Sequence, residues 1–282
     1  RREGARKFLR FEEDDYPNSV MWGDCGAFAY VEEHEPPYSV DEIVDFYSDG
    51  QFTHGCSVDH IIFEYQDTEF DFAFDDAEVK RRQEITLSNA AEFITKSRDR
   101  IGNHFTPVGV AHGWSPKTMA KAAIELVKMG YDYLALGGMV PLKAEQIMGA
   151  LKAVRAAIPD DVQVHILGFA KADYVQNFIG KGLDSVDTTS PLLRAFKDSR
   201  ANYYEWNGSA FNYYTAIRVP QVLTSPPLKR AVQSGKLELE KAVALERSAL
   251  SALRYYDKGE AGLKEVIEAV REYWTLINAE LA

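Results

Sequence analysis

The chain has 282 residues, of which 46% are hydrophobic, so it can bury a large core. This length fits one α/β barrel better than two separate domains. A net charge of −11 argues against a generally nucleic-acid-binding surface, because phosphate contacts need positive charge. Any polyanionic partner would therefore need a local basic patch.

No stretch approaches the roughly 20 apolar residues that span a bilayer, and no secretory leader is evident. We therefore expect a cytoplasmic protein without a membrane partner. Its two cysteines, Cys25 and Cys56, form neither a CxxC pair nor a Cys/His cluster. Because neither a disulfide framework nor a structural zinc site is indicated, we expect no metal and no cofactor.

Apolar runs of strand length recur along the chain, and most of them precede a helix-like pattern. They cover residues 20–28, 57–63, 107–112, 132–138, 163–168 and 183–188. This alternation indicates parallel strands joined by crossover helices, as in a (β/α)8 TIM barrel. Six units are visible where eight are required, and residues 7–11 and 215–219 are candidates for further strands.

The clearest helix is predicted to begin at Ser115-Pro116, an N-cap followed by proline, and to stop at Gly130. Further helices are predicted at residues 77–101, 143–158, 172–179 and in the tail 228–282. We expect residues 1–227 to form the catalytic barrel and residues 228–282 a helical extension packed on it. The aromatic stretch 202–214 is predicted to be a lid, a base-stacking loop or a packed surface loop.

Two aspartates, Asp24 and Asp187, each stand where an apolar run ends in a loop. Barrel enzymes collect their chemistry at the carboxyl ends of the strands. Two carboxylates at such a rim are typical of a nucleophile paired with a proton-transfer group. The sequence therefore predicts a barrel active site built around this pair.

Three further features fall at the same relative position: Asp59, His112 and the pair Gly137-Gly138. Taken singly, each has an ordinary structural explanation, namely a helix cap, a core histidine and a tight turn. Their shared position at successive strand ends favours a common site. A histidine there can donate or accept a hydrogen bond, and bare backbone can read the edge of a flat heterocycle.

These residues resemble the motifs of the guanine transglycosylases, which exchange guanine in a polynucleotide for a 7-deazaguanine. The family's Asp-Ser-Gly-Gly-Phe/Tyr is similar to residues 24–28, its Val-Gln-Gly to residues 111–113, and its Gly-Gly-Leu to residues 137–139. Its Leu-Met-Gly resembles residues 165–168, and its Gly-Ile/Val-Asp-Met-Phe-Asp resembles residues 182–187. The resemblance covers about residues 20–200 in order and spacing.

The resemblance implies roles for the matched residues. Asp187 would attack the anomeric carbon and form a covalent glycosyl-enzyme, while Asp24 would carry protons for the departing and arriving bases. The remaining matched residues would bind the base: Asp59 its amidine-like edge, Gly137, Gly138 and Met139 through backbone groups, Phe28 and Leu167 by sandwiching the ring, and His112 in place of the usual glutamine. Asp184 would have a supporting role.

The sequence departs from the family pattern in places, and these departures indicate which branch of the family it resembles. Members that act on tRNA carry a Cys-x-Cys-x-x-Cys zinc motif, whereas no cysteine follows Cys56 here. Residues 187–197 and 234–240 look more like the DpdA branch, the DNA-guanine transglycosylases. That implies DNA as the polymer, 7-cyano-7-deazaguanine (preQ0) as the incoming base, and helper proteins of a DNA-modification system as further partners.

Binding to a polynucleotide would require positive charge near the rim. The residues expected there are Lys171, Arg194, Lys197 and Arg200. A tRNA-directed enzyme and a non-catalytic transglycosylase subunit are the alternatives. The missing zinc motif argues against the first, and the presence of both Asp24 and Asp187 argues against the second.

Overall fold

The structure is a computed structural model that describes residues 4–12, 14–67, 76–169, 172–197 and 200–281. The chain divides into two compact units, residues 1–193 and 194–282, and each is described by itself. The first unit contains the strands and helices that position both predicted catalytic aspartates.

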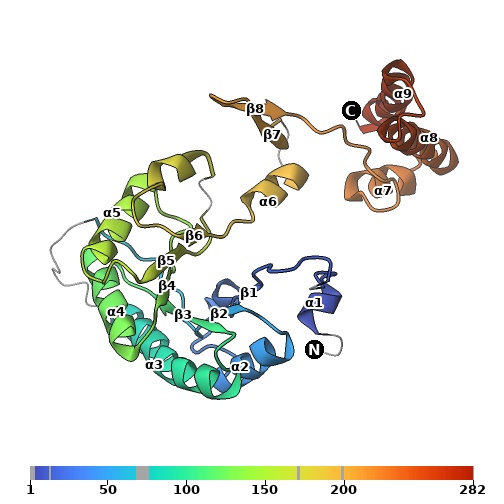
Figure 1. The fold of residues 1–282 in the computed structure, drawn as a ribbon. Coiled ribbons are helices and arrows are strands. Elements are labelled where there is room, and N and C mark those ends of the chain that lie inside the picture. Colours follow the sequence, from blue (N-terminus) through green and yellow to red (C-terminus); the bar gives the residue numbers. More distant parts are fainter. Residues whose placement is uncertain (1–3, 13, 68–75, 170–171, 198–199, 282) are drawn as a thin grey trace. The chain divides into compact units, whose positions relative to one another are not determined.

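The first unit is built on a curled sheet of parallel strands in sequential order, β1 to β6 (Figure 1). Their bounds are Trp22–Gly23, His54–Cys56, Thr106–Ala111, Tyr133–Leu136, Gln163–Ile166 and Ser185–Val186. Each strand pairs in parallel with the next one along the chain, for example His165 opposite Ser185. The predicted α/β class with parallel strands is therefore confirmed, as a part-barrel within the described residues.

Helices cover the outer face of this sheet (Figure 1). They are α2 to α5, at Val40–Asp49, Ala77–Arg100, Pro116–Met129 and Ala144–Arg155. Helix α4 begins and ends as predicted, because the Ser115 side chain accepts a hydrogen bond from the Thr118 amide and Gly130 adopts a left-handed conformation at the C-cap. Short helical segments complete the unit: α1 at Ala5–Phe8, and the 3₁₀ turns η1 at Ala27–Tyr30 and η2 at Ala172–Phe178.

The strands bury both faces. Leu134, Leu136 and Ile166 point outward into the main core beneath the helices. Val108 and Tyr133 belong to a smaller apolar cluster that includes Trp22 on the inner face. Because successive strand residues face opposite sides, every second residue of each strand lines the interior of the curl.

Three strand predictions were wrong. The run 57–63 is a buried loop that follows β2, and its apolar side chains Val58, Ile61 and Ile62 enter the core without strand pairing. Residues 7–11 contain the end of α1 and a turn, in which the Phe11 amide donates to the Arg6 carbonyl. Residues 215–219 form no strand; the Ala216 amide is instead bonded to the side chain of Asn202. Short apolar runs do not distinguish strands from buried loops.

The second unit begins within α6 (Ser190–Lys197). The aromatic stretch forms an antiparallel hairpin of β7 (Tyr203–Trp206) and β8 (Phe211–Tyr214). Three helices follow, α7 at Pro226–Gln233, α8 at Leu239–Asp257 and α9 at Leu263–Leu281, around a separate apolar cluster.

The compact units divide at 193/194, and the boundary at 227/228 between a catalytic barrel and a helical extension stays a prediction. The end of α6 is tied to the hairpin, because the Asn202 side-chain amide donates to the carbonyls of Arg194 and Ala195. The packing of residues 228–282 on the barrel stays a prediction. Among the described residues, the helices are all too short or too polar to cross a bilayer.

Candidate active site

The predicted site residues lie at the carboxyl edge of the sheet. Asp24 directly follows β1, His112 follows β3, Gly137 follows β4, Leu167 follows β5 and Asp187 follows β6. In a parallel sheet these ends meet on one edge, where active sites of α/β barrels are assembled. The structure therefore places these residues along one rim.

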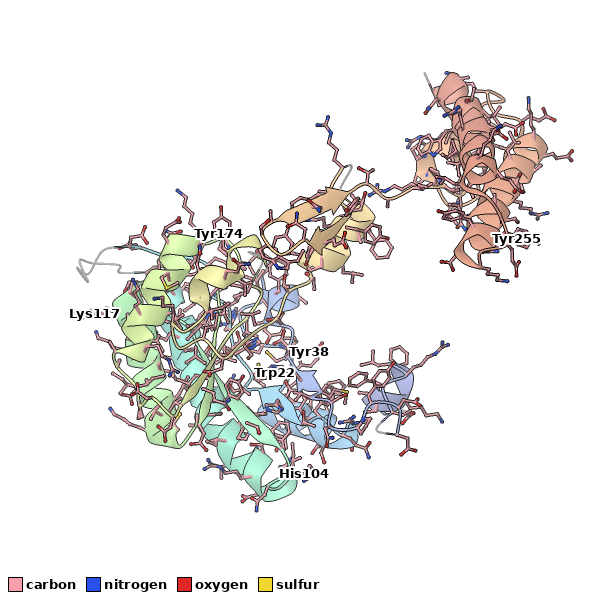
Figure 2. All side chains as sticks on the ribbon, turned by 45° about the horizontal axis from the view of Figure 1, so that its top comes forward. Trp22, Tyr38, His104, Lys117, Tyr174 and Tyr255 are labelled. Carbon is pink, nitrogen blue, oxygen red and sulfur yellow. The ribbon has the colours of Figure 1, made fainter. Side chains whose placement is uncertain are left out.

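A cavity of about 600 Å³ opens on the inner side of the curl and reaches this rim. Its lining includes both aspartates, together with Trp22, Tyr133, His165 and Leu167. Figure 2 shows Trp22 on the inner side of the sheet, opposite the outer layer of helices, where Lys117 marks α4. The two carboxylates thus face one shared space that is large enough for a nucleoside.

Asp187 is held in place by hydrogen-bond donors. Its Oδ1 accepts from the Gly168 amide at 2.7 Å and lies 3.2 Å from Nε2 of His165. Partial burial by itself raises the pKa of the carboxyl, but the bonds from His165 and Gly168 outweigh burial and lower the pKa below its ordinary value. The side chain is 55% exposed, so an ionised oxygen is open to the cavity.

Asp24 has the opposite environment. It opens onto the cavity, but surrounding protein displaces water from it and the negative charge of Asp59 lies nearby. Desolvation is the largest cause that raises the pKa of Asp24, and repulsion from Asp59 and, to a smaller extent, Asp187 raises it further, to about 6. Hydrogen bonds from the amides of Gly26 and Cys25 lower the pKa but do not offset these causes. A carboxyl with this pKa exchanges protons near neutral pH.

Behind Asp24 lies a buried polar cluster centred on Asp59. The Asp59 carboxylate contacts Nε2 of His112 at 2.6 Å and accepts a hydrogen bond from Sγ of Cys25 at 2.8 Å. The Tyr30 hydroxyl donates to the Asp59 carbonyl at 2.9 Å. Asp59 and His112 are only 2% and 1% exposed. The structure therefore brings together two of the predicted base-binding residues, Asp59 and His112, in direct contact.

The Gly137-Gly138 pair packs directly against this cluster. A Cβ atom on Gly137 would lie 2.3 Å from the ring of His112. At Gly138, where φ is +73°, a Cβ atom would lie 2.2 Å from the carbonyl oxygen of Ile62. Glycine is thus required at both positions, by close approach and by the left-handed backbone.

The other predicted base-binding residues are less closely grouped. Phe28 is 66% exposed, and its ring meets Phe63 edge-on with centroids 6.0 Å apart. Met139 is buried in the main core, whereas Leu167 lines the cavity. A sandwich of a base between Phe28 and Leu167 stays a prediction.

The predicted nucleic-acid-binding residues lie outside the first unit or outside the described residues. Lys171 belongs to the part of the chain that is not described. Arg194 lies over the rings of Tyr204 and Tyr213, 6.0 and 5.6 Å from their centroids, which is a cation–π arrangement. Lys197 ends α6, and the Arg200 carbonyl accepts a hydrogen bond from Thr215. Their contact with a polynucleotide stays a prediction.

Three potential metal-ligating side chains lie close together within the part of the chain that the structure describes. Ligand atoms of Asp24, Cys25 and Asp59 fall within 4.8 Å of one another. Burial and the neighbouring carboxylate of Asp59 raise the pKa of the Cys25 thiol well above its ordinary value. The protonated thiol donates its hydrogen bond to Asp59, so in this arrangement Cys25 belongs to the polar cluster around Asp59.

Residues on the inner face of the sheet were missed by the sequence analysis. Trp22, His165 and Ser185 precede Asp24, Leu167 and Asp187 by two positions each. Strand alternation with a period of two places each of them on the same face as the residue it precedes. That spacing was the available signal for these cavity residues.

Comparison with known proteins is consistent with this geometry. The family model described as queuine tRNA-ribosyltransferase matches residues 61–239, more than half of the chain. A DNA-guanine transglycosylase of Salmonella montevideo is 41% identical over 280 residues, which cover 99% of this chain and 65% of that protein. This chain therefore spans less than two thirds of that relative's length.

Relatives named queuine tRNA-ribosyltransferase are less similar to this chain. A queuine tRNA-ribosyltransferase of Acinetobacter baylyi is 21% identical over 68% of this chain and 51% of its own length. A protein of the same name from Pasteurella multocida is 28% identical over 45% of this chain and 31% of its own length. The family model matches most of the chain, and both aspartates lie at strand ends. The chain therefore belongs to the queuine tRNA-ribosyltransferase family, the guanine transglycosylases.

Proposed function

We propose that the chain exchanges guanine in DNA for a 7-deazaguanine, with preQ0 as the incoming base. The observation that carries this proposal is the pair of rim carboxylates with opposite pKa shifts, which face one cavity. The 41% identity to a protein named DNA-guanine transglycosylase supports DNA as the polymer. The part-barrel of β1 to β6 would belong to a complete (β/α)8 barrel in this enzyme.

In the first step, an oxygen of Asp187 attacks C1′ of the target nucleotide and the bond from C1′ to N9 of guanine breaks. Guanine leaves with the electron pair of that bond and takes up a proton from Asp24. In the second step, Asp24 receives the proton from N9 of the incoming base, which attacks C1′ and releases Asp187. The net result is base exchange with retention of configuration.

The base itself would be recognised by the cluster behind Asp24. Asp59, His112 and the backbone of Gly137, Gly138 and Met139 carry complementary donors and acceptors for its polar edge. In a duplex the target nucleotide has to leave the base stack before it can enter such a site. Phe28 and Leu167 are proposed to contact the faces of the ring.

Lys171, Arg194, Lys197 and Arg200 are proposed to contact DNA phosphates. Each lost phosphate contact should weaken binding uniformly across DNA sequences and reduce the salt slope by about 1. Replacing Lys197 with alanine and measuring DNA affinity at several salt concentrations tests this role. Lys128, which pairs with Glu125 on α4, is the matched control position. An unchanged salt slope for Lys197→Ala would remove this residue from the interface.

The function is tested by incubating the protein with preQ0 and either duplex DNA or tRNA, each labelled in guanine. We expect guanine release from DNA and a DNA adduct that is absent in Asp187→Asn. Release from tRNA alone would replace the DNA proposal with the tRNA-directed alternative. Release from neither polymer, with no adduct, would contradict the catalytic proposal and leave the non-catalytic subunit.

A further inference from the structure

A chain of hydrogen bonds runs behind Asp187 along the inner face of the sheet. We propose that His165, supported by Ser185 and Tyr133, is a positioning residue that holds one oxygen of Asp187 and leaves the other for attack. The catalytic part of this inference rests on the proposed role of Asp187 as nucleophile. The arrangement of the residues does not depend on it.

The hydrogen bonds in this network are short. The Tyr133 hydroxyl lies 2.6 Å from Oγ of Ser185, which lies 2.6 Å from Nδ1 of His165. On the other side of the ring, Nε2 of His165 lies 3.2 Å from Oδ1 of Asp187, and the Gly168 amide donates to the same oxygen at 2.7 Å. Both of these contacts engage Oδ1, so Oδ2 is the oxygen presented to the cavity.

The ionised carboxylate fixes the direction of the hydrogen bonds. A carboxylate only accepts, so Nε2 of His165 carries a hydrogen, and in the tautomer with its hydrogen on Nε2 the Nδ1 atom accepts from Ser185. Ser185 in turn accepts from Tyr133. Burial, with a smaller contribution from Asp184, raises the pKa of Tyr133, so its hydroxyl stays protonated and can donate at the end of the chain. One tautomer of His165 satisfies every link.

The ring of His165 is contacted on one face as well as at both ring nitrogens. The Trp22 ring stacks on it with centroids 4.5 Å apart and planes 25° apart. The His165 side chain is only 4% exposed, and its backbone is paired opposite Ser185 in the sheet. Because the imidazole cannot easily rotate, it restricts the carboxylate that it binds. Second-layer partners of this kind typically change activity or affinity 10- to 100-fold.

The tautomer can be measured without any activity. Protein labelled with ¹⁵N-histidine should show His165 predominantly as the tautomer with its hydrogen on Nε2. The titratable groups that line the same cavity as this ring are Asp24 from the end of β1, His54 from β2, Tyr133 from β4 and Asp187 from the end of β6. His165→Gln identifies the signal. In Ser185→Ala the preference for the Nε2 tautomer should weaken. A ring with its hydrogen on Nδ1 would overturn the proposed direction.

A second measurement follows the Asp187 carboxyl by ¹³C NMR. His165→Phe keeps a ring beside Trp22 but removes the donor, so the pKa of Asp187 should rise from its lowered value. His165→Gln keeps an N–H at the position of Nε2, and the pKa should stay low. Equal titration of Asp187 in wild type and His165→Phe would show that the histidine only fills space.

If the enzyme is active, the same variants separate positioning from packing. We expect formation of the covalent DNA adduct to slow on the order of 10- to 100-fold in His165→Phe, and less than about 10-fold in His165→Gln, with the substrate KM little changed. His104→Phe, on the loop before β3, is the control for loss of a histidine. Equal losses in the Phe and Gln variants would contradict a role that depends on the donor.

The proposed function and the positioning role of His165 can be contradicted independently of each other. If wild type forms no adduct while the tautomer and the titration of Asp187 are as expected, the proposed function fails and the positioning network stands. The other outcome is that wild type forms the adduct, while His165→Phe has the wild-type pKa of Asp187 and forms the adduct at the wild-type rate. In that case the proposed function stands and the positioning role is overturned.

Discussion

The ends of β1 and β6 carry the same residue type at the same topological position, but they have opposite surroundings. Asp24 lies beside a second carboxylate, Asp59, in a poorly hydrated region, and its pKa is raised to about 6. Asp187 receives hydrogen bonds from His165 and the Gly168 amide, and its pKa is lowered. Two aspartates at one rim are thereby given different pKa values, one near 6 and the other below the ordinary value.

This difference shows how a symmetric scaffold produces an asymmetric site. The parallel strands supply two equivalent positions, and the neighbouring strands and loops decide which carboxyl has the higher pKa. An ionised nucleophile and a carboxyl that titrates near neutral pH are the two groups that base exchange needs. Substitutions at the end of β1 or of β6 test this difference between the two aspartates, and their expected effects on activity differ in size.

The largest effect is expected at the β6 end. Asp187→Asn removes the carboxylate oxygen proposed to attack C1′ and should lower base exchange on the order of 10⁴-fold, with no covalent adduct. Single-turnover guanine release measures the loss. Asp184→Asn is the matched control, because Asp184 accepts from the Val164 amide at 2.7 Å and does not line the cavity. Near-normal adduct formation by Asp187→Asn would contradict its role as nucleophile.

The next effect is expected at the β1 end. Asp24→Asn should slow guanine release about 10²- to 10³-fold, because the leaving base loses its proton donor. In wild type, release should decline as pH rises through about 6, where Asp24 loses its proton. Asp187, with its lowered pKa, stays ionised throughout this range. The decline should disappear in Asp24→Asn, and its persistence there would assign it to another group.

A smaller change would sharpen the origin of this difference. Asp59→Asn removes one of the charges that raise the pKa of Asp24, although burial, the larger cause, remains. The pH at which guanine release declines should therefore move partway below 6. Asp41→Asn on α2 is the control, since that carboxylate pairs with Lys96 on α3. An unmoved decline would mean that Asp59 does not influence Asp24.

The smallest effect concerns stability. Asp24 has a higher pKa folded than unfolded, so the folded state binds more protons between its ordinary value and about 6, and stability falls as pH rises through this window. Asp24→Asn should therefore be more stable than wild type at pH 7.5, by up to about 1 kcal/mol, and not at pH 4. Urea unfolding at both pH values measures this. Equal stabilisation at both would attribute the gain to something other than the charge.

Much of the first unit could be predicted from local pattern. Apolar runs located five of the six strands of the sheet, and the caps at Ser115 and Gly130 defined α4. The run at 57–63 misled because a loop buried in the core is as apolar as a strand. Its consequence was small, since Asp59 still lies just beyond the end of β2 and close to the rim.

The second unit was predicted less well. The hairpin 203–214 was interpreted as a loop, because its aromatic residues are mostly exposed and show no contrast between two faces. The side chain of Asn202 joins the start of the hairpin to the end of α6, a contact that no periodic pattern reveals. Side-chain hydrogen bonds of this kind leave little trace in the order of residues.

The sequence by itself determined the parallel α/β arrangement and the placement of Asp24 and Asp187 at strand ends, because strand periodicity and the family's motifs are local and ordered along the chain. Only the tertiary structure decided which of the two has the raised pKa. That choice depends on Asp59 beside one carboxylate and on His165 with the Gly168 amide beside the other. These neighbours come from other loops and strands, and their charges and hydrogen bonds act only once the sheet has curled to bring them together.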